Sequence, residues 1–424
     1  MNILIKNGYV IDPATNREEV CDIYVEDNCI TQVEKDIAKE ADEVIDATAC
    51  YVMPGFIDLH VHLREPGFEY KETIKTGAMA AARGGFTSIC AMPNTNPAID
   101  SAQMVASLND KAKKDAVVHV LPVGAVTKGQ IGEELADIAG MVKEGAVAIS
   151  EDGKSVMDTA LYQKAMTIAK EEGIVVLAHC EDKSLVRGGV MNAGKTAETL
   201  GMPGITNAVE DVISARDILL AKEAGVKLHL CHCSTKDSAW MVEKAKEEGL
   251  PVTAEVCPHH FVLADEDIVE DDANYKMNPP LRSREDVNAL KEALRNNVID
   301  VIATDHAPHS EEEKKKSIKE SPFGIVGLET AFALTVTELV NTGYLTPRQL
   351  VEKMSFNPAK VLGINKGTLQ EGAIADIVIA NPKEEYIIDT KDFASKGKNT
   401  PFQGKTVCGK ILYTIVGGQV VYKA

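Results

Sequence analysis

The chain has 424 residues and a mass of 45.7 kDa, with 45 Lys and Arg against 64 Asp and Glu. The net charge of −19 argues against a nucleic-acid or anionic-membrane partner, because both need clustered positive charge. The 45% hydrophobic content is enough for a large buried core, and the 9 scattered cysteines are typical of reduced thiols. Without a signal-peptide-like start or an apolar run of about 20 residues, a cytoplasmic protein is expected.

Both ends of the chain have the sequence pattern of short strands separated by turns. Such strands are predicted at 2–11, 21–33, 375–382 and 405–424. We therefore expect residues 1–53 and 366–424 to combine in one small, composite β-sandwich domain. The residues between them, 54–365, have a different pattern and are expected to form the second domain.

The middle of the chain alternates between short apolar runs and helix-like stretches. Strand candidates occur at 56–63, 87–94, 117–126, 146–153, 174–180, 227–233, 251–260 and 298–309. This alternation implies parallel βα units, and eight of them over roughly 250 residues fit a closed, TIM-like (β/α)₈ barrel of the α/β class. The alternative is a doubly wound open sheet, which needs a glycine fingerprint after its first strand, where this chain has histidines.

Four of the ten histidines and two aspartates come at the C-terminal ends of predicted strands, the edge where barrel active sites are built. His60 and His62 are two residues apart on one strand, so they share a face with Cα atoms about 7 Å apart. His179, His232 and Asp305 end the fifth, sixth and eighth strands. Imidazole and carboxylate groups suit a divalent metal such as zinc, so their joint placement predicts a metal site.

The fourth strand ends in two acidic residues, Glu151 and Asp152, before the turn at Gly153. Two cations roughly 3.5–4 Å apart need a negative bridge, and strand alternation lets only one of these acids face the barrel axis. We favour Asp152, the last residue before the turn. The alternative is that both acids only cap the following helix.

Several other motifs are assigned to packing or solvent. Cys231 and Cys233 flank His232 and are therefore expected to face away from the metal. Neither His259 nor His260 is needed as a ligand, although one of them is placed to support the site. His119 and His229 fall within strands and are interpreted as core histidines, and the charge run at 311–320 as a solvated loop or helix start, with a mobile lid as the alternative.

The ordered set of motifs resembles the dihydroorotases of the amidohydrolase superfamily, and within them the longer, type I monofunctional bacterial enzymes. It covers nearly the whole chain: HVHLREPG at 60–67, MPNT at 92–95, ISEDG at 149–153, HCED at 179–182, CHCST at 231–235, KMNPPLR at 276–282 and ATDHAPH at 303–309. A His-x-His pair alone would indicate only the superfamily. The fuller set points to this family.

The resemblance implies a two-zinc centre, with manganese or cobalt as substitutes. The implied ligands are His60, His62 and Asp305 for the first ion and His179 and His232 for the second, with Asp152 as the bridge. Many relatives bridge through a carboxylated lysine instead. This chain has no lysine inside the fourth strand, although Lys154 follows just after the turn and is kept as the alternative.

The resemblance also implies how a substrate is held. Arg64 and Asn94 correspond to the family's binders of the substrate carboxylate, and an arginine fork matches that group in a bidentate way. Asn278 and His309 are expected to contact the ring amides and the carboxylate, and the Phe323–Gly324 segment the ring. His62 is counted among the substrate contacts as well as the ligands.

The implied reaction is the reversible interconversion of L-dihydroorotate plus water with N-carbamoyl-L-aspartate, the third step of pyrimidine biosynthesis. A metal-bound hydroxide is expected to attack the ring amide, with Asp305 as general base. Alternatives are another cyclic amidohydrolase, either a dihydropyrimidinase (hydantoinase) or an allantoinase, and a non-catalytic assembly partner that lacks ligands. The resemblance further implies a homodimer and, as in some members, association with aspartate transcarbamoylase.

Overall fold

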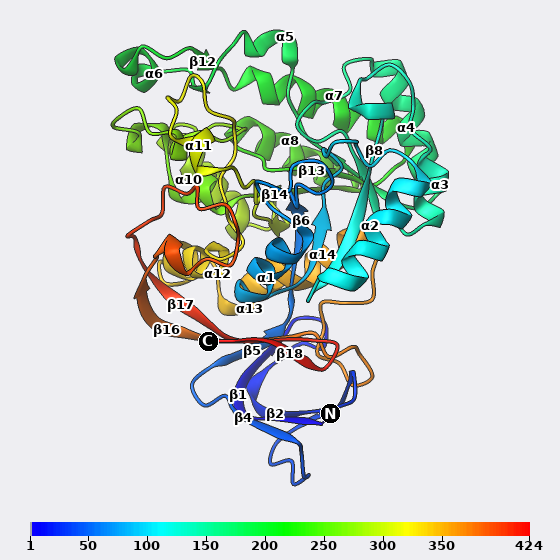
Figure 1. Ribbon diagram of the computed structural model, residues 1–424, viewed down its shortest axis with the longest axis vertical. Coiled ribbons are helices and arrows are strands. Elements are labelled where there is room, and N and C mark those ends of the chain that lie inside the picture. Colours follow the sequence, from blue (N-terminus) through cyan, green and yellow to red (C-terminus); the bar gives the residue numbers. More distant parts are fainter. Residues whose placement is uncertain (1) are drawn as a thin grey trace.

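The computed structural model of the protein describes residues 2–424, and its centre is a barrel of eight parallel strands (Figure 1). In chain order these are β6 (Phe56–Val61), β7 (Phe86–Ala91), β8 (His119–Ala125), β9 (Ala148–Ser150), β10 (Val175–Ala178), β13 (Leu228–Leu230), β14 (Val252–Val256) and β15 (Val301–Ile302). Each strand pairs with its successor. The two edges meet where His62 N donates to His306 O at 2.9 Å, so the predicted barrel is confirmed.

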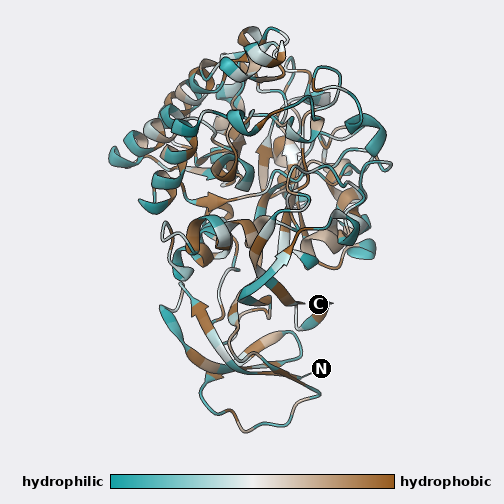
Figure 2. Ribbon diagram, turned by 90° about the vertical axis from the view of Figure 1, so that its left-hand side faces the viewer, coloured by the Kyte–Doolittle hydropathy of each residue, from teal (hydrophilic) through white to brown (hydrophobic). Residues whose placement is uncertain are grey.

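Helices cover the outside of the barrel between successive strands. They are α1 (Ile74–Arg83), α2 (Ala102–Asp115), α3 (Ile138–Lys143), α4 (Thr159–Glu171), α7 (Ala208–Ala224), α8 (Lys236–Glu247) and α10 (Arg284–Arg295). Most begin at a Ser, Thr or Asp whose side chain accepts from the first turn, as Thr235 does for α8 and Ser283 for α10. Figure 2 shows the resulting layering, with hydrophobic strands inside and hydrophilic outer helix faces.

Shorter elements lie in the connections between strands and helices. Between β10 and α7 the chain forms α5 (Lys183–Val186), β11 (Met191–Asn192), α6 (Lys195–Leu200) and β12 (Gly204–Ile205). After β14 comes α9 (Pro258–Val262), and after β15 come α11 (Glu311–Lys314), α12 (Ala331–Thr335), α13 (Pro347–Val351) and α14 (Asn357–Leu362). The start of the 311–320 charge run is therefore a short helix, capped by the Ser310 side chain.

The two ends of the chain form one sheet beside the barrel (Figure 1). Its strands are β1 (Ile3–Asp12), β2 (Arg17–Glu26), β3 (Cys29–Glu34), β4 (Glu43–Asp46), β5 (Tyr51–Pro54), β16 (Ile377–Ile387), β17 (Thr406–Val416) and β18 (Gln419–Lys423). β5 pairs with β1 on one side and β16 on the other, which joins the two termini and confirms the composite β unit. The chain passes from β5 to β6 at Gly55, where a Cβ would lie 2.2 Å from the Thr87 side chain.

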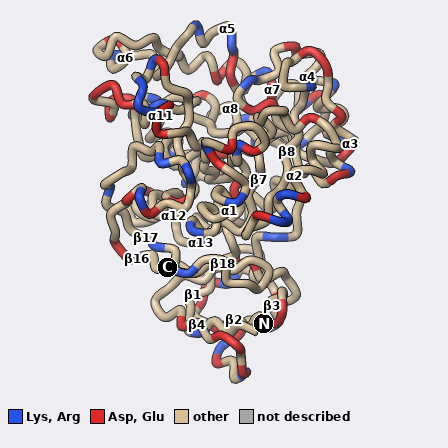
Figure 3. The backbone as a smooth tube through the Cα atoms, viewed as in Figure 1, with Lys and Arg blue, Asp and Glu red and all other residues tan. Residues whose placement is uncertain are grey.

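Charges are distributed over the whole surface. Figure 3 shows Lys and Arg interspersed with Asp and Glu along the outer helices. Within residues 2–424, no helix combines the length and apolar character needed to cross a membrane.

Candidate active site

Three strand ends bring the first group of predicted ligands together. His60 lies on β6 and His62 directly after it, while Asp152 and Asp305 follow β9 and β15. His60 Nε2 is 3.1 Å from Asp152 Oδ1 and 3.6 Å from Asp305 Oδ1. His62 Nε2 is 3.0 Å from Asp305 Oδ1 and 3.5 Å from Asp152 Oδ2. Asp152 and Asp305 therefore both face the same pair of imidazoles.

The remaining two predicted ligands lie on the other side of Asp152. His179 follows β10, and its Nδ1 is 3.5 Å from Asp152 Oδ1. His232 follows β13, with its Nε2 2.9 Å from His179 Nδ1 and 4.0 Å from Asp152 Oδ1. Asp152 is thus the carboxylate that lies between the two histidine pairs, the place that a bridging ligand requires.

The chemistry of this group fits a bound metal. His60 Nε2, Asp152 Oδ1 and His179 Nε2 are buried without a hydrogen-bond partner, which is costly unless something else satisfies them. The donor atoms of His60, His62 and Asp305 lie within 4.8 Å of one another, and so do those of His60, Asp152 and His232. Nitrogen and carboxylate donors of this kind suit zinc and similar divalent ions.

Burial and charge act in opposite directions on the carboxylates of the site. Burial raises the pKa of Asp152, but the neighbouring His60, His179 and His62 outweigh it and hold that pKa well below its usual range. Burial likewise opposes ionisation of Glu255, whereas hydrogen bonds from His229 and His60 lower its pKa to about 2. Both carboxylates are therefore ionised at neutral pH.

Three residues of the site adopt a backbone conformation that is unusual for residues other than glycine. Arg64, His232 and Asp305 have φ angles of 61°, 35° and 46°. Such left-handed geometry costs energy and persists only where surrounding contacts enforce it. This left-handed backbone geometry occurs just after the strands end, so strand alternation does not determine the direction in which these three side chains point.

A cavity of about 190 Å³ opens beside the predicted ligands. Its lining brings together all the residues predicted to contact a substrate: His62, Arg64, Asn94, Asn278, His309, Phe323 and Gly324. Asp152, His179, His232 and Asp305 line the same cavity, whereas His60 lies beneath them, fully buried.

Arg64 and His309 lie together in this cavity. The Arg64 guanidinium donates to Pro308 O at 3.2 Å and is 3.3 Å from His309 Nε2. His309 Nε2 is 2.7 Å from Phe323 O, and its Nδ1 is 3.2 Å from Lys71 Nζ. Burial and the neighbouring Arg64 and Lys71 hold the pKa of His309 far below its usual range, so the imidazole is neutral.

The two asparagines predicted to contact substrate have protein partners. Asn94 Oδ1 is 2.8 Å from His62 Nδ1, and Asn94 Nδ2 donates to Asp152 Oδ2 at 3.0 Å. Asn278 Nδ2 donates to Glu181 Oε2. Asn94 therefore also orients two of the predicted ligands, in addition to its place in the cavity lining.

The structure decides between Asp152 and its neighbours as the central acid. Glu151 turns away and accepts from the backbone N–H groups of Val126 and Thr127 at 3.1 Å. Lys154 donates from Nζ to Gln130 O at 3.0 Å. Only Asp152 of this segment lies among the histidines.

Two expectations from strand alternation are wrong. Cys231 does not face away from the predicted ligands, since its sulfur lies within 4.8 Å of donor atoms of His60 and Glu255. The reason is that β13 ends at Leu230 and the backbone turns at His232. His119 is not a core histidine: it starts β8 half-buried, with Nε2 3.2 Å from Asp376 Oδ1.

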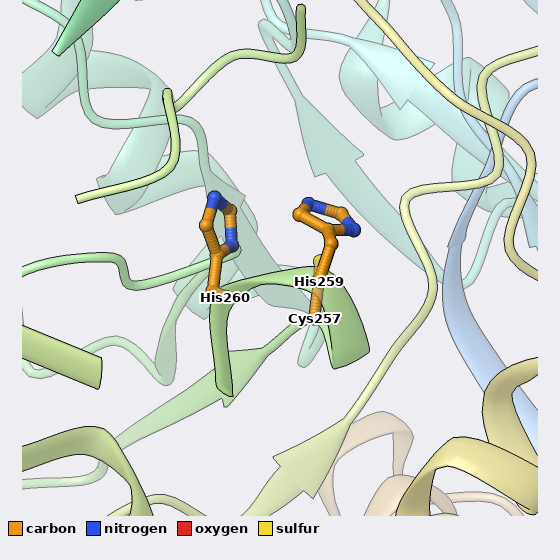
Figure 4. A group of neighbouring side chains, drawn as sticks. All are labelled: Cys257, His259 and His260. Atoms are coloured by element: carbon orange, nitrogen blue, oxygen red, sulfur yellow. The ribbon is translucent and has the colours of Figure 1, made fainter. Parts of the chain in front are cut away.

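Three buried residues after β14 form a separate group (Figure 4). Donor atoms of Cys257, His259 and His260 lie within 4.8 Å of one another. His260 Nε2 is 2.9 Å from Pro279 O. Burial and the neighbouring His260 lower the pKa of His259, and burial lowers the pKa of His260 to about 4, so both imidazoles are neutral at neutral pH.

Glu255 is the residue of the site that strand-end reasoning missed. It lies within β14 and is fully buried, with Oε1 3.0 Å from His60 Nδ1 and Oε2 3.0 Å from His229 Nε2. Its signal in the sequence is weak: a single acid in the apolar run PVTAEVC. An isolated acid there is costly to bury without a partner, but the sequence does not identify that partner.

The barrel, the strand-end histidines and aspartates, and the adjoining polar cavity define a metal-dependent hydrolase of the cyclic-amide class. Solved structures agree: an L-hydantoinase (dihydropyrimidinase) from Arthrobacter aurescens is 28% identical with a TM-score of 0.90, covering 99% of this chain and 96% of that one. A dihydropyrimidinase from Brevibacillus agri is 26% identical with a TM-score of 0.87, over 100% of this chain and 95% of the other.

Sequence comparisons identify the family. A family model described as dihydro-orotase-like matches residues 50–238. A dihydroorotase from Caldanaerobacter subterraneus is 50% identical over 100% of this chain and 98% of its own length, and one from Pelotomaculum thermopropionicum is 51% identical over 99% and 98%. The chain belongs to the dihydroorotase family.

Proposed function

We propose that the protein is a dihydroorotase, which interconverts L-dihydroorotate plus water with N-carbamoyl-L-aspartate. The observation that carries this proposal is the single cavity that has the histidine and aspartate group on one side and Arg64 with His309 on the other. A ring that bears an amide and a carboxylate matches this cavity, because the amide suits the histidine and aspartate group and the carboxylate suits Arg64. Full-length relatives near 50% identity that are named dihydroorotase support the same activity.

We propose zinc as the metal, with two ions in the group. The side chains that would hold them are His60, His62, Asp152, His179, His232 and Asp305. When bound, the metal supplies a Lewis acid that lowers the pKa of water and polarises an amide carbonyl.

Asp305 is proposed as the general base. Its carboxylate lines the cavity, so it is placed to take the proton of the attacking water and return it to the leaving ring nitrogen. In the biosynthetic direction it would remove a proton from the carbamoyl nitrogen. Asn94, through its contact with His62 Nδ1, keeps the Nε2 atom of that ring directed at Asp305.

Arg64 is proposed to bind the substrate carboxylate, with the neutral His309 beside it. Arginine suits this role because its planar guanidinium presents two parallel donors to a carboxylate. Burial lowers the pKa of Arg64, although the nearby Asp305 and Asp152 oppose that shift. The half-buried guanidinium contacts a carbonyl and an imidazole, neither of which neutralises its charge, so it is available for an anionic ligand.

A hydantoinase activity is the second candidate, favoured by the close structural likeness to such enzymes. Dihydropyrimidine and hydantoin rings without a carboxylate would leave Arg64 unpaired in the cavity. Leaving a buried charged group unpaired costs binding energy, which is why the dihydroorotase assignment is preferred.

The decisive experiment compares substrates on the zinc-loaded protein. We expect interconversion of dihydroorotate and carbamoyl aspartate, and turnover of dihydrouracil, hydantoin or allantoin at least about 100-fold slower, the cost of an unpaired buried ionic partner. Faster turnover of a ring without a carboxylate would assign the protein to the hydantoinases instead.

Homodimerisation and association with aspartate transcarbamoylase stay predictions from the family resemblance. Light scattering on the purified chain tests the first, and co-purification with a tagged transcarbamoylase from the same organism tests the second.

A further inference from the structure

One fully buried carboxylate contacts residues of both halves of the predicted metal group. Glu255 Oε1 is 3.0 Å from His60 Nδ1 and also accepts from the backbone N–H of His232 at 3.2 Å. Glu255 Oε2 is 3.0 Å from His229 Nε2, and His229 Nδ1 is in turn 2.8 Å from Thr253 Oγ1. Glu255 therefore receives three hydrogen bonds within the barrel and leaves none of its oxygens unpaired.

The contact with His60 selects the tautomer of that ring. A carboxylate can only accept, so His60 Nδ1 must carry a proton, and the neutral ring that binds a metal then has its lone pair on Nε2. It is Nε2 that faces Asp152 and Asp305 without a hydrogen-bond partner of its own. Without Glu255, the proton could move to Nε2 and block its lone pair.

The contact with His232 acts on the backbone rather than on the ring. His232 has a φ of 35°, a left-handed conformation that a residue other than glycine adopts only under constraint. The hydrogen bond from His232 N to Glu255 Oε1 helps to hold this turn after β13. In this conformation the His232 Nε2 atom is directed at His179 and Asp152.

We propose that Glu255 is a positioning residue that orients one ligand in each half of the metal group and thereby strengthens metal binding at both sites. Glu255 contacts His60, which faces Asp305, and the backbone of His232, whose ring faces His179. The contrast is Asn94, which contacts His62 and Asp152 but neither His179 nor His232. This inference rests on the proposed metal centre.

Three variants separate the contributions of Glu255. E255Q keeps an amide oxygen that can accept from His60 and from the His232 backbone. The new amide N–H₂ group can donate to His229 Nε2, because His229 can change tautomer and donate from Nδ1 to Thr253 Oγ1. E255L removes the acceptor altogether. H229Q changes only the group that supports Oε2. E329Q is the control, since the Glu329 side chain is only 2% exposed but accepts from Ala394 N and Ser395 N and pairs with Arg83 instead of contacting a predicted ligand.

The measurement is zinc binding by competition with a chelating dye, with the melting temperature of the metal-free protein recorded for each variant. Residues that hydrogen-bond to metal-bound histidines typically contribute about 10- to 100-fold in metal affinity. We expect about 100-fold weaker binding at both sites in E255L, about 10-fold in E255Q, a smaller loss in H229Q and none in E329Q. An N94A variant should weaken chiefly the first site.

The metal-free melting temperature separates positioning from folding. If Glu255 has a purely structural role, E255Q and E329Q should both lower the melting temperature of the metal-free protein. If Glu255 positions the ligands, zinc affinity should fall in E255Q and not in E329Q. Wild-type affinity at both sites in E255Q and E255L would overturn the inference. So would a loss confined to one site. Failure of the wild-type protein to bind zinc would instead contradict the proposed function.

Discussion

The cavity has two sides that are built in different ways. The proposed metal side has His60, His62, Asp152, His179, His232 and Asp305, all at or just after the ends of barrel strands. The cationic side has Arg64 and the neutral His309 in the cavity lining, supported by Lys71, Lys276 and Lys314 from loops and the short helix α11. Strand pairing alone brings the metal side together, whereas the cationic side depends on contacts between segments far apart in sequence.

Two buried lysines illustrate how the cationic side is held. Lys276 Nζ donates to Ser321 O at 2.6 Å and lies 4.4 Å from the centre of the Phe323 ring. Lys314 Nζ donates to Lys276 O at 3.2 Å and to Pro322 O at 3.1 Å. These lysines thus bind the backbone of the loop that carries Phe323 and Gly324. Because this loop is already ordered, binding a ligand to its backbone does not carry the conformational-entropy cost of ordering the loop.

The largest expected effect lies on the metal side. D305N removes the proposed base but keeps a side chain of the same size, so turnover should fall at least about 10³-fold. Most of the zinc should remain bound, because five other ligands are unchanged. The measurement is kcat together with metal content by atomic absorption.

D182N is the control, because Asp182 caps α5 near the same end of the barrel without lining the cavity. It should retain wild-type kcat. Acid–base catalysis typically contributes about 10²- to 10⁴-fold, so a D305N enzyme with turnover close to that of the wild type would remove Asp305 from its proposed role.

The next effect lies on the cationic side and should appear in substrate binding. R64Q removes a charged pair with the substrate carboxylate, which typically contributes about 1.5–3 kcal/mol, or roughly 10- to 150-fold in kcat/KM. Zinc content should not change. R64K should recover only part of the loss, because lysine lacks the planar fork.

R83Q serves as the control, since Arg83 pairs with Glu329 in the barrel's contact with the composite sheet. It should leave KM unchanged. If R64Q lost zinc rather than substrate affinity, the two sides of the cavity would not be separate in function.

The smallest effect concerns the pH dependence of stability. Burial and the nearby Lys276 lower the pKa of Lys314 to about 7 from its usual value of 10.5. Between these two values the unfolded chain binds more protons than the folded one, so this lysine makes the free energy of unfolding rise with pH. Below about pH 7 both states are protonated and its contribution no longer varies.

K314M should therefore lack part of the rise that the wild type shows between pH 7 and pH 9 in urea unfolding. The slope assigned to one group is at most about 1.4 kcal/mol per pH unit. K315M, which changes an exposed lysine paired with Glu311, should follow the wild type. Parallel curves for K314M and the wild type would show that Lys314 titrates normally.

The sequence by itself predicted the barrel, the composite β unit and the six strand-end residues that the structure brings together. Period-two apolar runs specify strands, and eight βα units in succession leave few ways to bury them other than a closed barrel. Because parallel strands align their C-terminal ends, residues such as His179 and Asp305 could be placed together without knowledge of any contact. The motif resemblance then predicted the family and the substrate-contact residues.

Only the tertiary structure decided the supporting contacts. The pairing of Glu255 with His60, the turn that brings Cys231 beneath His60, and the buried Lys314 under the 321–324 loop each depend on where separate segments meet. Local spacing carries no information about such contacts, since a buried charge in a strand or helix can be satisfied by many partners. The choice among them is made by packing, which exists only once the barrel has closed.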